Sequence, residues 1–597
     1  MNRTSALYLL RQKMVAEKLD AYILPSSDPH QSEYIPDHWQ FRAWFSGFTG
    51  SAGTIVVTRD FAGLWTDSRY FIQAAKQLEG SGIELVKLKI PHTPEFIDWL
   101  GKTLSPGKRV GFDSRFFTVA MVRLMQQSFK DKGIKLVAGP DLLTPLWKNR
   151  PALPDHPVIN YDIRYAGLSR VDKINLVKER LREKGGEYHL ITTLDDIAWL
   201  LNLRGNDVDF CPFFVSYALI GPEKTWLFID PSKVPDTLKK QLAAEGIVLK
   251  PYDQISSFLE ALPTDSNLYF DPGRTSQTLY DAIPEKMKRI EGINLTTLLK
   301  SIKNPVEIRQ LKEVMIRDGV AWVKLLYWLD QELKQHHRLT ELSIAQQIAI
   351  FRSEQKDYRG ESFHPISSYN WHGAVIHYSV NAEESLTVHP DGIFLLDSGG
   401  HYLGGTTDTT RTISLSKPTA EQKAHFTRVL KGTLGISMLK FPRGTKGFQM
   451  DVLARQSLWN SGLNYGHGTG HGVGSYLSVH EGPQTIGTSA SGNQNIIFEP
   501  GMVTTVEPGI YLEGAYGIRT ENMTLVVEDE ENEFGRFYRF ETLTLVPIDQ
   551  NLIDTFLLTR DEIDWLNRYH KRVFQTLAPL LTPDEQLWLK QKTQPLT

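Results

Sequence analysis

Hydrophobic and polar positions follow the same order twice in the first half of the chain. In the first copy, a helical pattern that begins at Ser5 leads into the strand AYILP, and FRAWFSGFTGSAG, TIVV and LWTDSRY follow. In the second copy, a helical pattern near Ser169 leads into EYHLITT, and DDIAWLLNLRG, FFVSYALIG, TWLFID and PSKV follow. Each copy predicts helix, strand, helix, glycine-containing turn and β-hairpin, which is the order expected of an α/β domain.

The linkers between these patterns divide the chain into three regions. RPALPDHPV, residues 150–158, is rich in proline and closes the first copy. In SIKNPVEIRQLKE, residues 301–313, Asn304 and Pro305 precede a long helical pattern, as they do at the start of a helix. We therefore expect α/β domains at residues 1–153 and 154–302 and a third domain at residues 303–597. A chain of 597 residues is also too long for one core, since a domain commonly holds roughly 100–200 residues.

The third region alternates helices with glycine-punctuated hairpins, and it ends in a helical tail. The tail, TRDEIDWLNRYHKRVFQTLAPLLTPDEQLWLKQ, predicts two amphipathic helices. We expect its apolar positions Trp565, Leu566, Tyr569 and Val573 to pack on the body of the domain rather than to hold a ligand.

Two stretches of the third region share one design, and each carries two carboxylates. In GIFLLDSGGHYLGGTTDTTRTISL an apolar strand ends at Asp397, and Asp408 opens the returning strand. In MVTTVEPGIYLEGAYGIRTENMTLVV an apolar strand ends at Glu507, and Glu521 lies on the return. A single acid at a strand end is usually a cap or a turn residue, but two matched hairpins gather four. Because buried carboxylates repel one another unless they are protonated or neutralised by cations, we predict a metal site here.

Three histidines lie between these stretches, in NYGHGTGHGVGSYLSVHEGP. His467 and His471 have the four-residue spacing of a helical zinc pair, but the glycines between them argue for a loop or strand. A lone histidine is usually a packed or surface group, whereas three histidines, with His480 the last, among many glycines favour a site. Four carboxylates and an imidazole suit Mn²⁺ or Co²⁺ and permit Zn²⁺. Two such ions about 3.5 Å apart can share a hydroxide and stabilise both the attacking and the departing oxygen.

Charge and composition exclude several other classes. A formal net charge of -3 and a pI near 6.6 provide no electrostatic footprint for nucleic acid or an anionic membrane. No apolar run approaches the roughly 18 residues of a membrane span, and the N-terminus lacks the apolar core of a signal peptide, so we expect a cytoplasmic protein. Cys211 is the only cysteine, which excludes an intrachain disulfide and a thiolate zinc cage. We expect Cys211 to be buried as a small hydrophobic residue.

At these residues the sequence resembles the pita-bread metallopeptidases, a family that includes methionine aminopeptidase, prolidase and Xaa-Pro aminopeptidase. The similarity covers nearly the whole chain and is greatest to the long, three-domain cytosolic Xaa-Pro aminopeptidases. It is carried by FSGFTGSAGT, LWTDSRYF, IAWLLNLRG, HGTGHGVGSYLSVHEGP and VEPGIY. The family's ligands follow the order Asp, Asp, His, Glu, Glu, and every one of these positions is filled here.

The resemblance implies an α/β (α+β) fold, in which two related creatinase/prolidase N-terminal-type domains precede a pita-bread catalytic domain. It implies a metal-dependent aminopeptidase that hydrolyses the N-terminal Xaa-Pro bond of peptides with a hydroxide held by two divalent metal ions. Mn²⁺ is the first choice for these ions, and Co²⁺ or Zn²⁺ are alternatives. Peptides with proline at position two are the implied substrates, without nucleic acid or membrane as a partner. The resemblance also implies a homodimer formed through the third domain.

The same resemblance implies roles for individual ligands. Asp408 and Glu521 would bridge the two ions, Asp397 would chelate one of them, and His471 and Glu507 would bind the other. Glu507 would also serve as the general base or acid for the bridging water.

Five further positions, none of them a predicted metal ligand, also match the family. His377, His467 and His480 match its substrate histidines, which contact the scissile carbonyl and the prolyl pocket. Tyr511 and Arg519 match residues that lie beside the metal ligands, orient the ligand equivalent to Asp397 and guide protons.

Alternative interpretations remain open. Prolidase performs the same chemistry on dipeptides, and only the duplicated N-terminal domains favour the aminopeptidase. The family's His-Tyr motif often continues toward a proline, whereas Ser379 and Val380 follow here. A non-catalytic peptide-binding protein is the alternative of another class, because pita-bread domains are reused in that way, but the intact ligand set argues against it. Arg42 in the first domain is open to a substrate contact or to a packing role.

Overall fold

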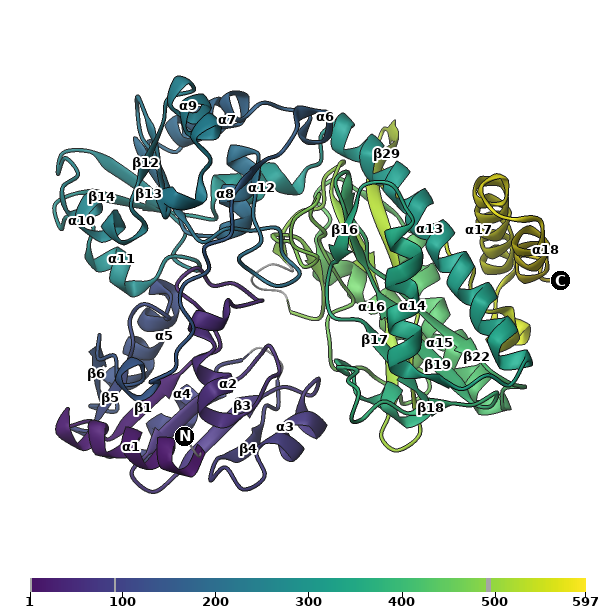
Figure 1. Cartoon of the computed structure of the whole chain (residues 1–597), viewed down its shortest axis with the longest axis horizontal. Helices are drawn as coiled ribbons and strands as arrows, with labels where there is room; N and C mark the ends of the chain where they lie inside the picture. The colour runs from purple at the N-terminus through teal and green to yellow at the C-terminus, as the bar shows by residue number, and fades with distance from the viewer. Residues whose placement is uncertain (1–2, 91–92, 490–494) are drawn as a thin grey trace. The chain divides into compact units, whose positions relative to one another are not determined.

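The computed structural model describes residues 3–90, 93–489 and 495–597, and the chain divides into two compact units. Unit 1 holds Met1–Ile163 and Leu168–Leu299, and unit 2 holds Arg164–Gly167 and Lys300–Thr597. Figure 1 shows the elements of both units. Among the described residues, no helix combines the length and the apolar character needed to cross a membrane.

Unit 1 contains two six-stranded sheets with the same strand order and the same pairing directions. The orders are β4-β3-β2-β1-β5-β6 and β12-β11-β10-β8-β13-β14. In the first sheet β1, β2 and β3 are antiparallel neighbours, and β4, β5 and β6 are added in parallel. In the second sheet β8, β10 and β11 are antiparallel neighbours, and β12, β13 and β14 are added in parallel. This equivalence confirms the two related α/β domains predicted from the repeated pattern.

The elements of unit 1 have the following bounds. The first sheet consists of β1 (Ala21–Leu24), β2 (Thr54–Thr58), β3 (Ala62–Thr66), β4 (Glu84–Lys87), β5 (Arg109–Phe112) and β6 (Lys135–Ala138), with helices α1 (Arg3–Ala16), α2 (Phe41–Ser46), α3 (Phe71–Gln77), α4 (Glu95–Thr103) and α5 (Val119–Lys130). The second sheet consists of β8 (Tyr188–Ile191), β10 (Tyr217–Ile220), β11 (Thr225–Phe228), β12 (Ile247–Lys250), β13 (Asn267–Phe270) and β14 (Lys288–Glu291), with helices α7 (Arg170–Glu183), α8 (Leu194–Leu201), α9 (Asp236–Ala244), α10 (Ile255–Glu260), α11 (Gln277–Asp281) and α12 (Leu295–Ser301).

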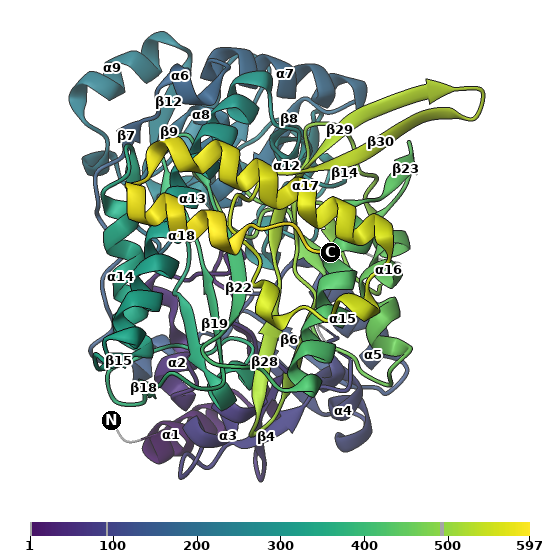
Figure 2. The same cartoon turned by 90° about the vertical axis from the view of Figure 1, so that its right-hand side faces the viewer.

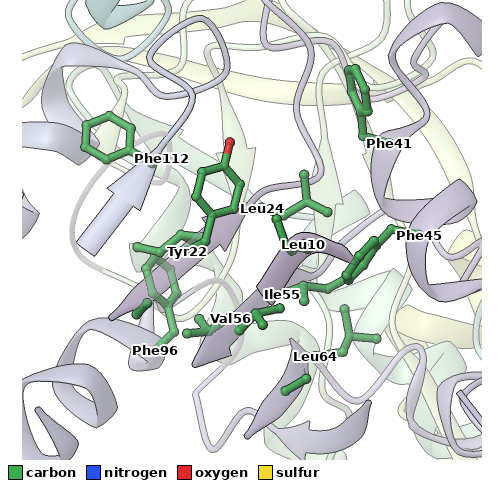
Figure 3. Packing of buried hydrophobic residues seen from close by; sticks show 14 of the residues in the cluster. Leu10, Tyr22, Leu24, Phe41, Phe45, Ile55, Val56, Leu64, Phe96 and Phe112 are labelled. Carbon is green, nitrogen blue, oxygen red and sulfur yellow. The ribbon is translucent and has the colours of Figure 1, made fainter. Parts of the chain in front are cut away.

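The core of the first sheet is packed from both strands and helices, as Figure 3 shows. Tyr22, Ile55 and Leu64 come from adjacent strands, and Leu10 of α1 and Phe96 of α4 pack into the same cluster. Full burial of such a side chain contributes about 1.5–3 kcal/mol to stability, so the apolar runs of these strands, which are buried along their length, hold the sheet to its helices.

Two residues of unit 1 that the sequence singled out have packing roles. The Arg42 guanidinium is buried, donates to the carbonyl oxygen of Gly50 and to the hydroxyl of Ser26, and lies over the ring of Phe48. These contacts hold the glycine-rich turn after α2. Cys211 is buried, as predicted, and burial raises the pKa of its thiol.

Unit 2 consists of small antiparallel sheets and long helices, which Figure 2 shows from a second side. Its strands are β15 (Leu339–Thr340), β16 (Tyr358–Glu361), β17 (Ile366–Tyr369), β18 (Thr387–Val388), β19 (Ile393–Ser398), β20 (Gly400–Tyr402), β21 (Gly405–Thr406), β22 (Thr409–Ser414), β23 (Lys440–Pro442), β24 (Gly470–His471), β25 (Thr485–Ile486), β26 (Val503–Val506), β27 (Gly509–Leu512), β28 (Tyr516–Arg519), β29 (Asn522–Asn532) and β30 (Gly535–Thr542). Its helices are α13 (Pro305–Lys334), α14 (Glu341–Ser353), α15 (Ala420–Ser437), α16 (Gly447–Trp459), α17 (Arg560–Leu577) and α18 (Pro583–Lys592).

Helix α13 begins where the sequence predicted a helix start. The Asn304 side chain accepts from the backbone amides of Val306 and Glu307, while the Glu307 carboxylate accepts from the amide of Asn304, and Pro305 occupies the first turn. Near this start, the Asn304 amide group also donates to the carbonyl oxygen of Ala166 at 2.9 Å, so the short segment Arg164–Gly167 belongs to unit 2.

The tail forms the two predicted helices, α17 and α18, which pack along α13 (Figure 2). Leu566, Tyr569 and Val573 are buried in the core of the unit, and Trp565 is partly buried against it. The packing role predicted for this apolar face is therefore confirmed.

Candidate metal centre

Each predicted metal ligand lies at or beside the end of a strand. Asp397 lies near the C-terminal end of β19, and Asp408 directly precedes β22, the antiparallel partner of β19. Glu507 directly follows β26, and Glu521 directly precedes β29, the antiparallel partner of β26. His471 ends β24. Each strand pair thus presents one carboxylate from each of its two strands.

The two strand pairs meet at Thr410. The backbone amide of Glu521 donates to the carbonyl oxygen of Thr410 at 3.2 Å, and the Thr410 hydroxyl donates to the Glu521 carboxylate at 2.8 Å. These bonds join positions 111 residues apart in the sequence. Sequence reasoning missed Thr410, because a threonine on a strand has no spacing signal of its own.

The ligand atoms of six residues form three overlapping groups, in each of which all atoms lie within 4.8 Å of one another. The groups are Asp397, Asp408 and Glu521; His471, Glu507 and Glu521; and Asp408, His471 and His480. The structure therefore brings all five predicted ligands together. His480, which the sequence assigned to substrate, lies in the same cluster, with its ring 4.3 Å from that of His471.

The cluster concentrates negative charge in a buried place. Asp397, Asp408 and Glu521 are only 7%, 4% and 1% exposed. Burial, together with neighbouring carboxylates, raises the pKa of Asp397, Glu507 and Glu521. Asp408 is the exception: burial raises its pKa, but the hydrogen bond and charge of His471, the charge of His480 and a hydrogen bond with Glu521 together lower it.

The donor set fits two divalent cations. Oδ1 of Asp397 is buried, and no group of the described residues forms a hydrogen bond with it. A buried carboxylate oxygen without a donor is costly, whereas a cation placed between several such oxygens neutralises them all. Four carboxylates and one imidazole are ligands that Mn²⁺, Co²⁺ or Zn²⁺ accepts.

His471 presents one ring nitrogen to this cluster. Its Nδ1 lies 2.9 Å from the carbonyl oxygen of Gly472, which can only accept, so Nδ1 carries a proton. Its Nε2 lies 3.4 Å from Asp408 and 3.5 Å from Glu507. Although burial lowers it, the hydrogen bond to Asp408 and the charge of Glu507 raise the pKa of His471 to about 9. A metal ion at Nε2 would take the place of the proton held there.

Arg519 and Tyr511 connect the cluster to His467. Arg519 donates through Nη2 to Asp397 at 2.5 Å and through Nη1 to the Tyr511 hydroxyl at 2.7 Å. The Tyr511 hydroxyl lies 2.8 Å from Nε2 of His467, whose Nδ1 donates to the carbonyl oxygen of Gly468 at 2.7 Å. Tyr511 therefore donates to His467, and one chain of hydrogen bonds runs from Asp397 to His467.

A buried ion pair of α16 holds the loop that carries His467. Arg455 pairs with Asp451 at 2.7 Å and donates to the carbonyl oxygens of Tyr465 and His467, each at 2.8 Å. The Thr469 hydroxyl donates to Asp451 at 2.5 Å. Sequence reasoning missed this pair, because an acid and a base four apart on a helix are most often on the surface.

A second buried ion group lies next to His480. The Glu481 carboxylate is 2.6 Å from the Lys303 ammonium and 3.3 Å from that of Lys300, and all three side chains are buried. His377 is half-buried in the turn after the 3-10 helix η5 (Asn370–Ala374) and belongs to none of the three ligand groups.

Family models cover most of the chain. Residues 7–144 and 149–307 match two models described as "Creatinase/Prolidase N-terminal domain". Residues 309–528 match "Metallopeptidase family M24", and residues 536–596 match "C-terminal region of peptidase_M24".

Similar proteins match the chain over its full length. Aminopeptidase P2 from Arabidopsis thaliana is 39% identical over 97% of this chain and 86% of its own length. A probable Xaa-Pro aminopeptidase P from Coprinopsis cinerea is 39% identical over 100% of this chain and 99% of its own.

A solved structure extends this similarity to the fold. It is described as "Crystal structure of X-prolyl aminopeptidase from Caenorhabditis elegans: a cytosolic enzyme with a di-nuclear active site". It is 35% identical, covers 100% of both chains and has a TM-score of 0.95. The chain therefore belongs to metallopeptidase family M24, among its long members related to aminopeptidase P that carry two creatinase/prolidase N-terminal domains.

Proposed function

We propose that this protein is a metal-dependent aminopeptidase that releases the first residue of peptides whose second residue is proline. The observation that carries the proposal is the cluster of four carboxylates and His471, found in a chain that aligns end to end with an X-prolyl aminopeptidase described as having a di-nuclear active site. Fold likeness alone would not suffice, because one fold serves many functions.

The ligand groups suggest how two ions would be divided among the side chains. Asp408 and Glu521 would hold both ions, Asp397 would hold one, and His471 and Glu507 would hold the other. Glu521 shares one group with Asp397 and another with His471 and Glu507, and Asp408 shares groups with Asp397 and with His471, which supports this division. His471 also belongs to two groups, but its one unprotonated nitrogen can bind a single ion. We propose Mn²⁺ as the native ion, with Co²⁺ or Zn²⁺ as alternatives, because oxygen donors predominate. When bound, the ions would lower the pKa of a water molecule toward about 7 and polarise the scissile carbonyl.

Glu507 would move the proton that cleavage requires. Its side chain is 19% exposed, so it borders the cluster without being sealed inside it. Burial raises the pKa of its carboxyl group. A group that both accepts and donates a proton works best when its pKa is near the pH at which the enzyme operates. Cleavage of an Xaa-Pro bond leaves the nitrogen of proline in need of a proton, and Glu507 would pass on the one it takes from water.

His377, His467 and His480 would contact the peptide. Proline has no amide N–H and a fixed φ, so a site that selects it must rely on shape and on contacts to the carbonyl. An imidazole N–H aimed at the carbonyl oxygen would stabilise the negative charge that develops there. In His467 the Gly468 carbonyl oxygen and the Tyr511 hydroxyl engage both ring nitrogens and orient the ring, so this residue would contact the peptide through its ring rather than through a free N–H.

We also propose the organisation of the whole enzyme as three domains, at residues 1–153, 154–302 and 303–597. We propose a cytoplasmic location as well, which the likeness to a protein described as a cytosolic enzyme supports. A homodimer formed through the third domain rests on the family resemblance, and light scattering after size exclusion would measure it.

Hydrolysis of three peptides by chelated and reconstituted protein tests the function. We expect Mn²⁺, Co²⁺ or Zn²⁺ to restore release of Arg from Arg-Pro-Pro, with little cleavage of Met-Ala-Ser. Cleavage of Arg-Pro alone would move the assignment to prolidase. If no peptide is cleaved with any of the three metals, the enzymatic function is refuted and a peptide-binding protein is favoured.

A further inference from the structure

Glu341 is a buried carboxylate to which the proposed chemistry gives no role. It is the first residue of α14, its side chain is 0% exposed, and it is not a member of the three ligand groups. A carboxylate sealed from water in this way is costly unless donors surround it.

Four donors converge on the two oxygens of Glu341. Oε1 accepts from the backbone amide of Tyr369 at 2.7 Å, and Nδ1 of His372 lies 2.9 Å from each of the two oxygens. Oε2 accepts from the Tyr378 hydroxyl at 3.0 Å and from the backbone amide of Leu386 at 2.8 Å. Burial and the nearby carboxylate raise the pKa of Tyr378, so its hydroxyl stays a donor.

These donors all belong to one segment, residues 369–386, and two of them lie at its ends. The amide of Glu341 itself donates to the carbonyl oxygen of Leu386 at 3.1 Å, which strengthens the second end. Between the ends, the rings of His372 and Tyr378 stack at 4.3 Å, and the amide of Tyr378 closes a turn on the carbonyl oxygen of Val375 at 3.0 Å. His377 lies inside that turn, and donors to Glu341 stand on both sides of it in the sequence, His372 before it and Tyr378 directly after it.

We propose that Glu341 is a positioning residue that fixes the turn carrying His377 so that this histidine meets the substrate carbonyl. The inference rests on the role given to His377 in the proposed function. Catalytic side chains must be held to within about 0.5 Å of their productive positions. Around His377 the segment 369–386 forms no helix or strand that could fix the position of this side chain so closely. The Glu341 carboxylate, at the start of helix α14 and bound by four donors of the segment, would fix it instead.

Glu341→Gln is the sharpest variant, because it keeps the shape and removes acceptors. Whichever way the carboxamide is oriented, its NH₂ group faces either the amide of Tyr369 or that of Leu386, and that amide loses its acceptor. We expect kcat on Arg-Pro-Pro to fall about 10- to 100-fold, as for residues that orient catalytic groups, with KM and metal content little changed.

Glu307→Gln is the matched control. Glu307 is also a buried glutamate in the first turn of a helix of unit 2, but its capping partner is Asn304. It should alter stability without altering kcat. Tyr378→Phe removes a single donor to Glu341 and should also lower kcat, but by a smaller factor. This variant keeps the proposal testable if the Glu341→Gln protein folds poorly.

The coupling to His377 decides the matter. In a His377→Ala background, Glu341→Gln should add less than about a twofold change, because the two act as one unit. Independent, multiplying effects would overturn the proposal, as would a kcat equal to wild type in both Glu341→Gln and Tyr378→Phe. Absence of peptidase activity in the wild-type protein would instead refute the proposed function, so the two failures are distinguishable.

Discussion

Single buried charges in unit 2 hold together segments that are far apart in sequence. The Arg411 guanidinium donates to the carbonyl oxygen of Glu521 at 2.6 Å, to that of Val546 at 2.9 Å and to the Tyr569 hydroxyl at 3.0 Å. A planar fork with five donors on three nitrogens suits this task, whereas a lysine ammonium places its three donors on a single atom. The segment that carries Glu521 is thereby tied to helix α17 by one side chain.

Replacing Asp408 with Asn tests the ligand assignment. Asn keeps the size of the side chain but removes the charge that two ions would share. We expect turnover of Arg-Pro-Pro to fall by more than the roughly 10- to 100-fold that loss of an orienting residue costs, and metal content to drop below two ions per chain. Metal analysis after dialysis, together with initial rates, measures both.

Glu528→Gln is the control for that variant, because Glu528 is an exposed carboxylate on β29, the strand that follows Glu521. It should change neither value. Full metal content with normal turnover in Asp408→Asn would contradict the assignment.

A functional side chain could be predicted from the sequence only where the residues next to it form a recognisable pattern. The carboxylates at strand ends have such a pattern, because apolar runs and glycine loops mark each one. The Lys303–Glu481 contact has none, since 178 positions separate the partners and no spacing rule reaches that far. Glu341 looked like any acid in the first turn of a helix, where such residues are common.

Close packing between strands explains the glycine directly before His471. A Cβ added to Gly470 would lie 2.0 Å from the carbonyl oxygen of Thr505, whereas one added to Gly468 would lie 3.5 Å from that of Ile486. Strand β24 therefore approaches β26 closely at the residue before the ligand, and the neighbouring glycine of the same motif has ordinary space.

Gly470→Ala and Gly468→Ala should thus behave differently. Overpacking at Gly470 forces a backbone shift that costs about 1–3 kcal/mol and displaces the adjacent His471. We expect a lower free energy of unfolding and weaker Mn²⁺ binding for Gly470→Ala, measured by denaturant titration and calorimetry, and values near wild type for Gly468→Ala. Equal loss of Mn²⁺ affinity in both variants would show that the close approach is not the cause.

The strands themselves were foreseeable, but their partners were only partly so. The stretch from Glu507 to Glu521 reads as one hairpin, yet β26 pairs with β29 while β27 and β28 pair in a sheet of their own. Alternation of apolar residues marks a strand and its buried face, whereas the choice of neighbour is made by packing between distant segments.

Each unit also contains a buried histidine that stays neutral when the chain is folded. His189 lies in β8 of unit 1, and burial lowers its pKa to about 4. His570 lies in α17 of unit 2, where burial and then the charge of Arg411 lower its pKa to about 4. The pKa of an unfolded histidine is near 6.5.

Both units should therefore lose stability in mild acid. Between pH 6.5 and pH 4 the unfolded chain binds a proton at each histidine that the folded chain does not, so the free energy of unfolding falls as pH falls. The loss amounts to about 3 kcal/mol per histidine across that window. Calorimetry at pH 7 and pH 4.5 measures it, and His189→Gln and His570→Gln should flatten the dependence, whereas exposed His389→Gln should not. A slope that is the same in all variants would exclude these histidines as its source.

The division of the chain into units was harder to foresee than its domains. The repeated pattern revealed the two sheets of unit 1, because helix, strand and hairpin recur in order. The segment Arg164–Gly167 belongs to unit 2 although it lies in the sequence between the two sheets. Four residues are too few to show a periodicity, so only their contact with Asn304 discloses where they pack.

The meeting of Thr410 with Glu521 has a consequence for how the protein is made. Its partners are 111 positions apart, so a chain still on the ribosome has no complete ligand set until the second strand pair has emerged and folded against the first. Pairings of such long range form late, after the entropy of closing the intervening loop has been overcome. Two bound ions would therefore mark chains in which both strand pairs have folded together, and products that end before Glu521 would lack the complete ligand set.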